Sequence, residues 1–90
     1  MENYLIIQLK TIDDVKRFVC ATRKCLGEVN ISSSRSTVNA KSIMGIMSLS
    51  LADPLRVETQ GYEDLFTIVR DINKTIVIES FSFVVRGEYG

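Results

Sequence analysis

The sequence predicts one α+β domain. Short segments rich in β-branched and aromatic residues alternate with segments whose apolar residues recur every three or four positions, as in amphipathic helices. Read along the chain, they give strand, helix, strand, strand, helix, strand and helix, followed by an undecided tail, and this order is typical of α+β domains. A chain of 90 residues with 46% hydrophobic and 24% charged residues has the size and composition of one small globular core.

The first strand is predicted over residues 4–9, where β-forming residues dominate. A helix follows, because Thr11 stands where an N-cap is expected and Asp14 completes a capping pattern three residues later. Asp13 adds negative charge to the first turn. Gly27 is a suitable end for this helix. Its apolar stripe consists of Ile12, Val15, Phe18, Val19, Thr22 and Leu26.

The middle of the chain predicts a hairpin and a short helix. Residues 28–34 and 36–40 have the composition of two strands around a serine-rich turn, whose type stays open because it lacks glycine. Residues 42–51 begin with a capping serine and stop before Asp53 and Pro54. We expect a short helix there, with a strand as the alternative.

The last third predicts a strand over residues 55–59 and then a helix that reaches about Asn73. Residues 75–85 are mostly β-branched or aromatic, so propensity favours a strand, although the preceding helical stripe could continue. We leave this tail open. The helical stripe consists of Leu65, Ile68, Val69 and Ile72.

Charge and cysteine content indicate which partners and which kinds of site are not expected. Eleven basic and eleven acidic residues give no net charge, so we expect no nucleic-acid partner and no membrane partner. No apolar run approaches the ~20 residues of a membrane span, and no signal peptide is visible, so we expect a cytoplasmic protein. Cys20 and Cys25 lie about 140° apart on a helix, which predicts two free thiols, with Cys20 facing away from the apolar stripe. Without histidine or a CxxC pair, we expect no metal and no cofactor.

Residues 38–49, Val-Asn-Ala-Lys-Ser-Ile-Met-Gly-Ile-Met-Ser-Leu, resemble the VNAKSIMGLMSLGL signature of HPr-like proteins, the phosphocarriers of the bacterial sugar phosphotransferase system. The similarity continues without gaps through Phe18 and Val19 and through Val29 and Ile31, and it weakens beyond Asn73. The resemblance implies a four-stranded antiparallel sheet, ordered 1-4-2-3, with three helices covering one face as an open-faced sandwich.

The same resemblance implies a lost phosphorylation site. Carried over without a gap, the phosphorylated histidine of the family falls on Thr11, and its arginine and proline fall on Asp13 and Asp14. These carboxylates would satisfy the helix dipole and repel a phosphoryl group. The simpler interpretation is that the three residues only cap a helix.

The signature itself is nearly intact. Ser42 occupies the position at which some HPr-like proteins are phosphorylated for regulation, although it could serve only as an N-cap. Ile43, Met44 and Met47 resemble the apolar patch with which the family binds its partners, although a helix so apolar must also contribute core residues.

These observations favour a regulatory protein-binding module over an enzyme. It would resemble the catabolite-repression HPr-like proteins, and its partners would be phosphotransferase-system or transcription-regulatory proteins. The alternative is a structural subunit whose apolar segment, residues 76–85, pairs with another copy in a homodimer. An enzyme is not expected, because the sequence offers neither a histidine base nor a thiol paired with a base.

Overall fold

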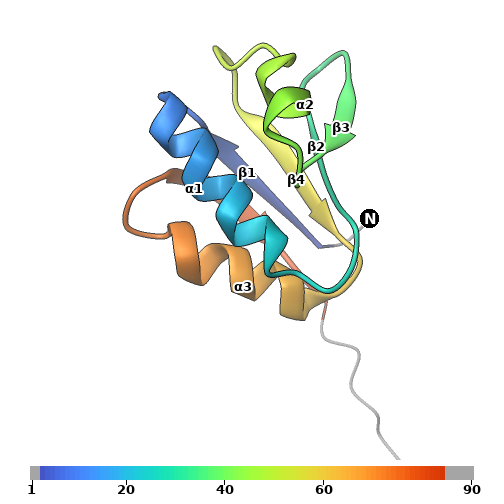
Figure 1. Cartoon of the computed structure of the whole chain (residues 1–90). Helices are drawn as coiled ribbons and strands as arrows, with labels where there is room; N and C mark the ends of the chain where they lie inside the picture. The colour runs from blue at the N-terminus through green and yellow to red at the C-terminus, as the bar shows by residue number, and fades with distance from the viewer. Residues whose placement is uncertain (1–2, 85–90) are drawn as a thin grey trace, which may run out of the picture.

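The computed structural model describes residues 3–84, which form three helices and a five-stranded antiparallel sheet (Figure 1). The order of the elements agrees with the sequence prediction. The elements are β1 (Tyr4–Gln8), α1 (Ile12–Arg23), β2 (Val29–Ser32), β3 (Thr37–Asn39), α2 (Ile43–Met47), β4 (Leu55–Thr59), α3 (Tyr62–Ile72) and β5 (Val77–Ser82).

The sheet corrects the expectation of four strands. Its order is β3-β2-β4-β1-β5, so the expected order 1-4-2-3 is present, and β5 adds a fifth strand beside β1. Within the tail left open by the sequence, Ile78 pairs with Ile7 and Phe81 with Leu5. Ile78 packs against the core, which gives this segment a reason to be a strand. Val85 and the rest of the tail lie outside the described residues.

The core lies between the sheet and the helices. Alternate residues of β1, β2 and β4 are fully buried, while their neighbours are half-buried, so one face of the sheet packs against the helices and the other stays open. On the open face Arg56 forms an ion pair with Glu58 and lies over the ring of Tyr4. Among the described residues, no helix is long and apolar enough to cross a membrane.

The apolar stripe of α1 is shorter than the sequence predicts. Val15, Phe18 and Val19 are buried, but Ile12 is 60% exposed and Leu26 is 98% exposed. Leu26 leaves the stripe because the helix ends at Arg23, and the following loop takes a different course to β2.

That loop is fixed from a distant part of the chain. The carboxylate of Asp64, in α3, accepts hydrogen bonds from the backbone N–H groups of Leu26 and Gly27, at 3.1 and 2.9 Å. The expected end of the helix near Gly27 is therefore wrong by several residues.

The hairpin and the short helix are confirmed. The backbone N–H of Ser33 donates to the carbonyl of Ser36, and the Ser33 hydroxyl accepts from the N–H groups of Arg35 and Ser36. A serine hydroxyl thus stabilises this turn without glycine. Residues 42–51 contain a helix and not a strand, but α2 covers only Ile43–Met47.

Candidate functional site

The start of α1 is closed by the chain's own side chains. The hydroxyl of Thr11 accepts a hydrogen bond from the backbone N–H of Asp14 at 3.0 Å, and the Asp14 carboxylate accepts one from the N–H of Lys10 at 2.9 Å. The first bond is the N-cap that the sequence predicts, whereas the Asp14 carboxylate reaches the N–H one residue before the N-cap. Asp13 is exposed in the same turn. A phosphoryl group would meet two carboxylates here, where an anion site needs unused N–H groups and positive charge.

The start of α2 has a similar cap. The Ser42 hydroxyl accepts from the backbone N–H of Gly45 at 3.1 Å, and Ser42 itself is extended. A Cβ atom at position 45 would lie 3.3 Å from the Oγ of Ser42 and 3.4 Å from the Cβ of Val38 in β3, so glycine relieves crowding mainly at the cap itself. Ser42 is half-buried at this junction.

The exposed face of α2 is apolar. Met44 is 84% exposed, Met47 is 45% exposed and Ile43 is 37% exposed, whereas Ile46 between them is fully buried. We call Ile43, Met44 and Met47 the α2 patch. The sequence left a choice between a binding surface and core for these three residues, and the structure places all three at the surface.

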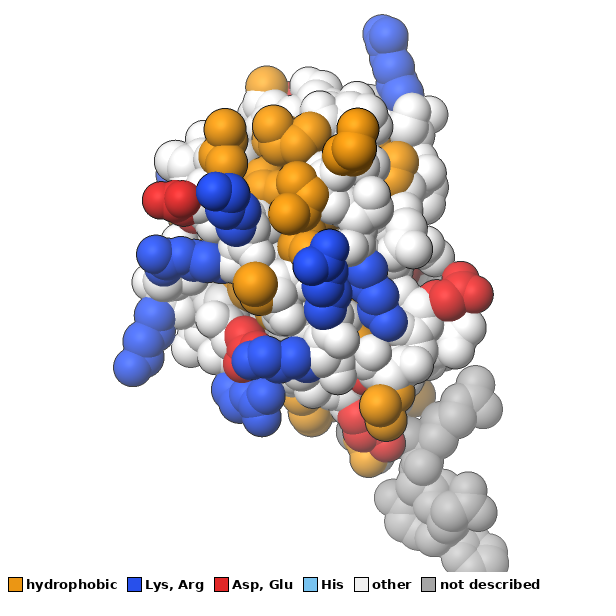
Figure 2. All heavy atoms as spheres, in the orientation of Figure 1, with side chains coloured by type: hydrophobic (Ala, Val, Ile, Leu, Met, Phe, Trp, Pro, Cys, Tyr) orange, Lys and Arg blue, Asp and Glu red, His pale blue; other side chains and the backbone are white. Residues whose placement is uncertain are grey.

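Figure 2 shows how this surface continues. Apolar side chains gather over α2 and the start of α1, and Lys and Arg side chains border them on the same face. Ile12, in the first turn of α1, is also exposed. Sequence reasoning assigned Ile12 to the core and did not include it in the surface.

Charge is placed unevenly along the chain. Residues 16–41 contain six basic side chains and a single acidic one, Glu28, although the whole chain carries no net charge. A net charge of zero gives no sign of this excess of basic residues. Counting the charges segment by segment reveals it. The basic residues are Lys16, Arg17, Arg23, Lys24, Arg35 and Lys41.

Buried hydrogen bonds fix α2 relative to α1. The hydroxyl of Thr22, fully buried in α1, lies 2.9 and 2.8 Å from the carbonyl oxygens of Val19 and Ala40, which share its one proton. Nearby, Arg23 Nε donates to the carbonyl of Lys41, and Lys41 Nζ donates to the carbonyl of Cys25. The segment that leads into α2 is therefore held by the last turn of α1 and the loop after it.

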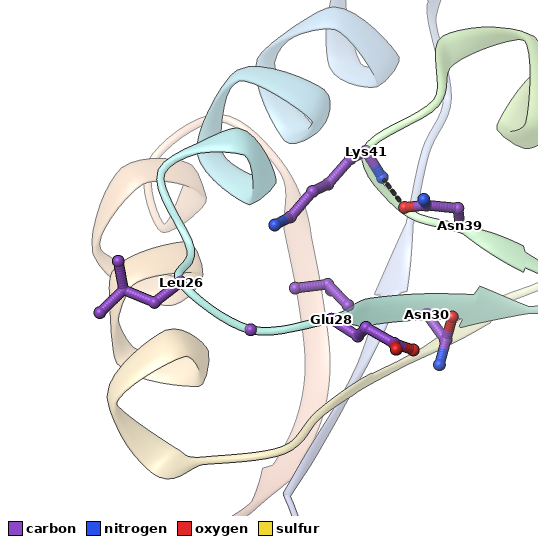
Figure 3. A pocket seen from close by; sticks show the side chains of 7 residues that line it. Leu26, Glu28, Asn30, Asn39 and Lys41 are labelled. Carbon is purple, nitrogen blue, oxygen red and sulfur yellow. Dashed lines mark hydrogen bonds between the residues drawn. The ribbon is translucent and has the colours of Figure 1, made fainter.

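A hollow of about 390 Å³ lies beside this segment (Figure 3). Lys41 extends over it, and the backbone N–H of Lys41 donates to Asn39 Oδ1 at 2.8 Å. Leu26 points away from it. The polar side chains that line it include Glu28 and Asn30, and no nucleophile stands next to a base among the lining residues. This hollow therefore gives no support to a catalytic site.

The two cysteines differ in environment. Cys20 is exposed and Cys25 is buried, and both are free thiols, as predicted. Burial, together with the Asp64 carboxylate, raises the pKa of Cys25 to about 11, against a smaller opposing effect of Lys41. Cys25 is thus a neutral thiol near pH 7 and a poor nucleophile. Within residues 3–84, no three potential ligands from His, Cys, Asp and Glu lie close enough together to hold a metal ion.

Comparison with known proteins finds one family. The chain matches the family model described as the PTS HPr component phosphorylation site over residues 15–70. The match includes Ser42 and the α2 patch, and it begins after Thr11, Asp13 and Asp14. No curated protein matches the chain. No solved structure matches it either.

Proposed function

The chain belongs to the HPr family of the phosphotransferase system, and from this we propose that it is a regulatory protein-binding member that carries no phosphohistidine and catalyses no reaction. One observation carries the proposal: the α2 patch is exposed within the matched segment, while Thr11 and Asp14, onto which the resemblance carries the phosphorylation site, form a helix cap. The fold of the family would then serve for binding alone.

Loss of the carrier reaction follows from side-chain chemistry. The sequence contains no histidine, and a threonine hydroxyl lacks the nucleophilicity of imidazole at neutral pH. The Thr11 hydroxyl also accepts a hydrogen bond from the backbone N–H of Asp14. The carboxylates of Asp13 and Asp14 would repel an incoming phosphoryl group. These features support a binding role in which phosphoryl transfer is absent.

The chemistry of the surface indicates the kind of partner. Two methionines and an isoleucine form an adaptable apolar centre, since the methionine side chain is flexible and polarisable. Lys and Arg side chains border this centre (Figure 2). A complementary partner offers an apolar hollow with an acidic rim. Within the phosphotransferase system, we propose the general enzyme that phosphorylates HPr proteins, with a transcription-regulatory protein as the alternative partner.

Met44→Asp tests this proposal. Because Met44 is 84% exposed, the variant should fold normally, but a charge at the centre of the interface should weaken binding to the general enzyme at least about tenfold. Leu26→Asp is the matched control, because Leu26 is 98% exposed and lies in the loop before β2. Titration calorimetry at low and high salt measures both variants, and binding of the wild type should weaken at high salt. Equal binding by Met44→Asp and the wild type would contradict the proposal.

We further propose that phosphorylation of Ser42 regulates this binding. Ser42 directly precedes the α2 patch, and its hydroxyl is half-buried beside the N–H of Gly45. A phosphate there would add about two negative charges next to the apolar centre and would weaken attraction to an acidic rim. The effect would be on the choice of partner, with the domain remaining folded.

Ser42→Ala and Ser42→Asp distinguish regulation from capping. If Ser42 only caps α2, both variants should bind the general enzyme like the wild type. If a negative charge regulates binding, Ser42→Asp should bind more weakly than Ser42→Ala, and the difference should shrink at high salt. Thermal unfolding of both variants checks that α2 and the core are intact.

A further inference from the structure

The edge of the sheet at β5 is a second exposed surface. β5 is the last strand of the sheet, and among residues 3–84 it has a strand neighbour only on the side of β1. Natural edge strands are usually protected from further pairing by lysine, proline, a bulge or inward-pointing charges. β5 contains no lysine or proline, and its one charged residue, Glu79, lies at the bulge where the register with β1 shifts.

Beyond this bulge, the described part of the edge, residues 80–84, contains no lysine, proline or charged residue. The Glu79 carboxylate is hydrogen-bonded to the side chain of Gln8, across the pair with β1. Residues 80–84 have the sequence Ser-Phe-Ser-Phe-Val and carry no charge. Among residues 3–84 no strand pairs with this stretch on the side away from β1, and its apolar side chains are exposed.

Three phenylalanines form a cluster on this edge. Phe66 of α3 and Phe83 meet edge to face with ring centroids 4.7 Å apart, and Phe81 stacks on Phe83 at 6.1 Å. Phe66 remains 45% exposed, Phe81 52% and Phe83 38%. We call Phe66, Phe81 and Phe83 the aromatic edge. A hollow of about 470 Å³, lined in part by Val69 and Ile78, borders Phe81. Adjacent aromatic rings exposed to this extent are typical of interaction surfaces.

We propose that a second copy of this chain pairs antiparallel with β5 and covers the aromatic edge. The pattern Phe81-Ser82-Phe83 is self-complementary, because side chains alternate between the two faces of a strand. A twofold axis at Ser82 places Phe81 of each copy opposite Phe83 of the other, on the face that contains α3. Cross-strand aromatic pairs of this kind stabilise antiparallel strands.

The charge pattern favours a copy over a different protein. Residues 80–84 are uncharged, so a twofold axis brings no like charges together, and the stretch offers no charge to attract an oppositely charged partner. Two copies would form a closed, isologous dimer with one continuous sheet. This pairing would continue the sheet beyond β5, its last strand.

The size of the surface predicts a weak dimer. Phenylalanine buries about 150–250 Å² when fully covered, and the three rings are roughly half covered already. Two such clusters would therefore bury roughly 400–700 Å² of aromatic surface, about half of the lower limit of about 1,200 Å² for stable interfaces, and the paired backbone edges add to this area. We expect dissociation in the micromolar range or above.

The dimer would leave the α2 patch free. α2 contacts β3, at the opposite edge of the sheet from β5 (Figure 1). Each dimer would present two α2 patches and would bind a multivalent partner with higher avidity than one copy does. Failure of the proposed partner binding would therefore not affect the dimer, and failure of the dimer would not affect partner binding.

Sedimentation equilibrium of the full chain, from low micromolar to near-millimolar concentration, tests the proposal. We expect the average mass to rise toward twice that of the chain. Phe81→Asp should weaken the dimer at least about tenfold, whereas Leu26→Asp and Met44→Asp should dimerise like the wild type. A wild type that stays monomeric throughout would overturn the proposal, as would a dimer lost in Met44→Asp and kept in Phe81→Asp.

Crosslinking at the proposed axis provides a test that does not depend on the fold of Phe81→Asp. Ser82→Cys, in a Cys20→Ser background, should form a disulfide-linked dimer under mild oxidation, because the two thiols would meet across the axis. Thr37→Cys in the same background is the control, since Thr37 is exposed on β3 at the other edge. Equal crosslinking of the two variants, or faster crosslinking at position 37, would overturn the assignment to β5.

Discussion

At the residue scale, Thr22 joins two parts of the molecule that the binding surface needs. Its buried hydroxyl donates to the carbonyl of Ala40, just before α2, as well as to Val19 within α1. Thr22→Val keeps the shape of the side chain but leaves the Ala40 carbonyl without this donor. We expect a loss of about 1–3 kcal/mol in the free energy of unfolding, measured by urea denaturation.

Thr67→Val is the matched control for this prediction. The Thr67 hydroxyl also donates to a backbone carbonyl, that of Glu63, but within α3 at a partly exposed position. The control should lose much less stability, because water can replace the hydrogen bond. Equal losses in the two variants would show that the link between Thr22 and Ala40 contributes little.

Cys25 predicts a pH dependence of stability. Burial and Asp64 raise the pKa of its thiol from an ordinary value of 9.0 to about 11, so the folded state favours the neutral form. This contribution is fully present below pH 9 and is lost as the pH rises toward 11. The free energy of unfolding should therefore fall over this range, and it should fall less steeply in Cys25→Ala. Cys20→Ala, which alters an exposed thiol, should keep the slope of the wild type.

Single residues show where sequence reasoning succeeds and fails. The cap at Thr11 and the exposure of Cys20 could be predicted, because both depend on neighbours within one or two turns of helix. The exposure of Leu26 could not, because Asp64 fixes its loop from 38 positions away along the chain. Ile12 fits the apolar period equally well, but the period does not tell how far the sheet extends beneath a helix.

At the element scale, α1 begins with a cap at Thr11, the position onto which the resemblance carries the family's phosphorylated histidine. Thr11→Ala removes the hydrogen bond to the N–H of Asp14, so we expect a loss of about 1 kcal/mol in the free energy of unfolding. Thr37→Ala is the control, because Thr37 is exposed on the short strand β3. Urea denaturation measures both, and equal losses would show that Thr11 has no special role as a cap.

β5 illustrates what element prediction cannot supply. Val77, Ile78 and Phe81 are β-branched or aromatic, but the apolar period of α3 could also continue into this segment, so local sequence leaves both structures open. Pairing with β1 decides the outcome, since Ile78 lies beside Ile7 and joins the core. For α2 the cap and the stop were visible in the sequence, but the helix ends at Met47, well before Asp53.

At the scale of the whole molecule, the two proposed binding surfaces lie at separate places. The α2 patch lies toward the β3 edge of the sheet and the aromatic edge lies at β5, with the core between them. The α+β class and the order of the elements could be predicted from hydrophobic periods. The basic border could not be found from a net charge of zero, because it arises from where the charges are placed.

The central claim is that this HPr-family chain binds a phosphotransferase partner without carrying phosphate. A phosphoryl-transfer assay tests both parts together. It contains labelled phosphoenolpyruvate, the general enzyme and a histidine-bearing HPr, with the chain added in excess. We predict that the chain stays unlabelled and slows transfer to the active HPr, and that Met44→Asp slows it much less. Acid-labile label on the chain, or an undiminished rate at every concentration of the chain, would contradict the claim.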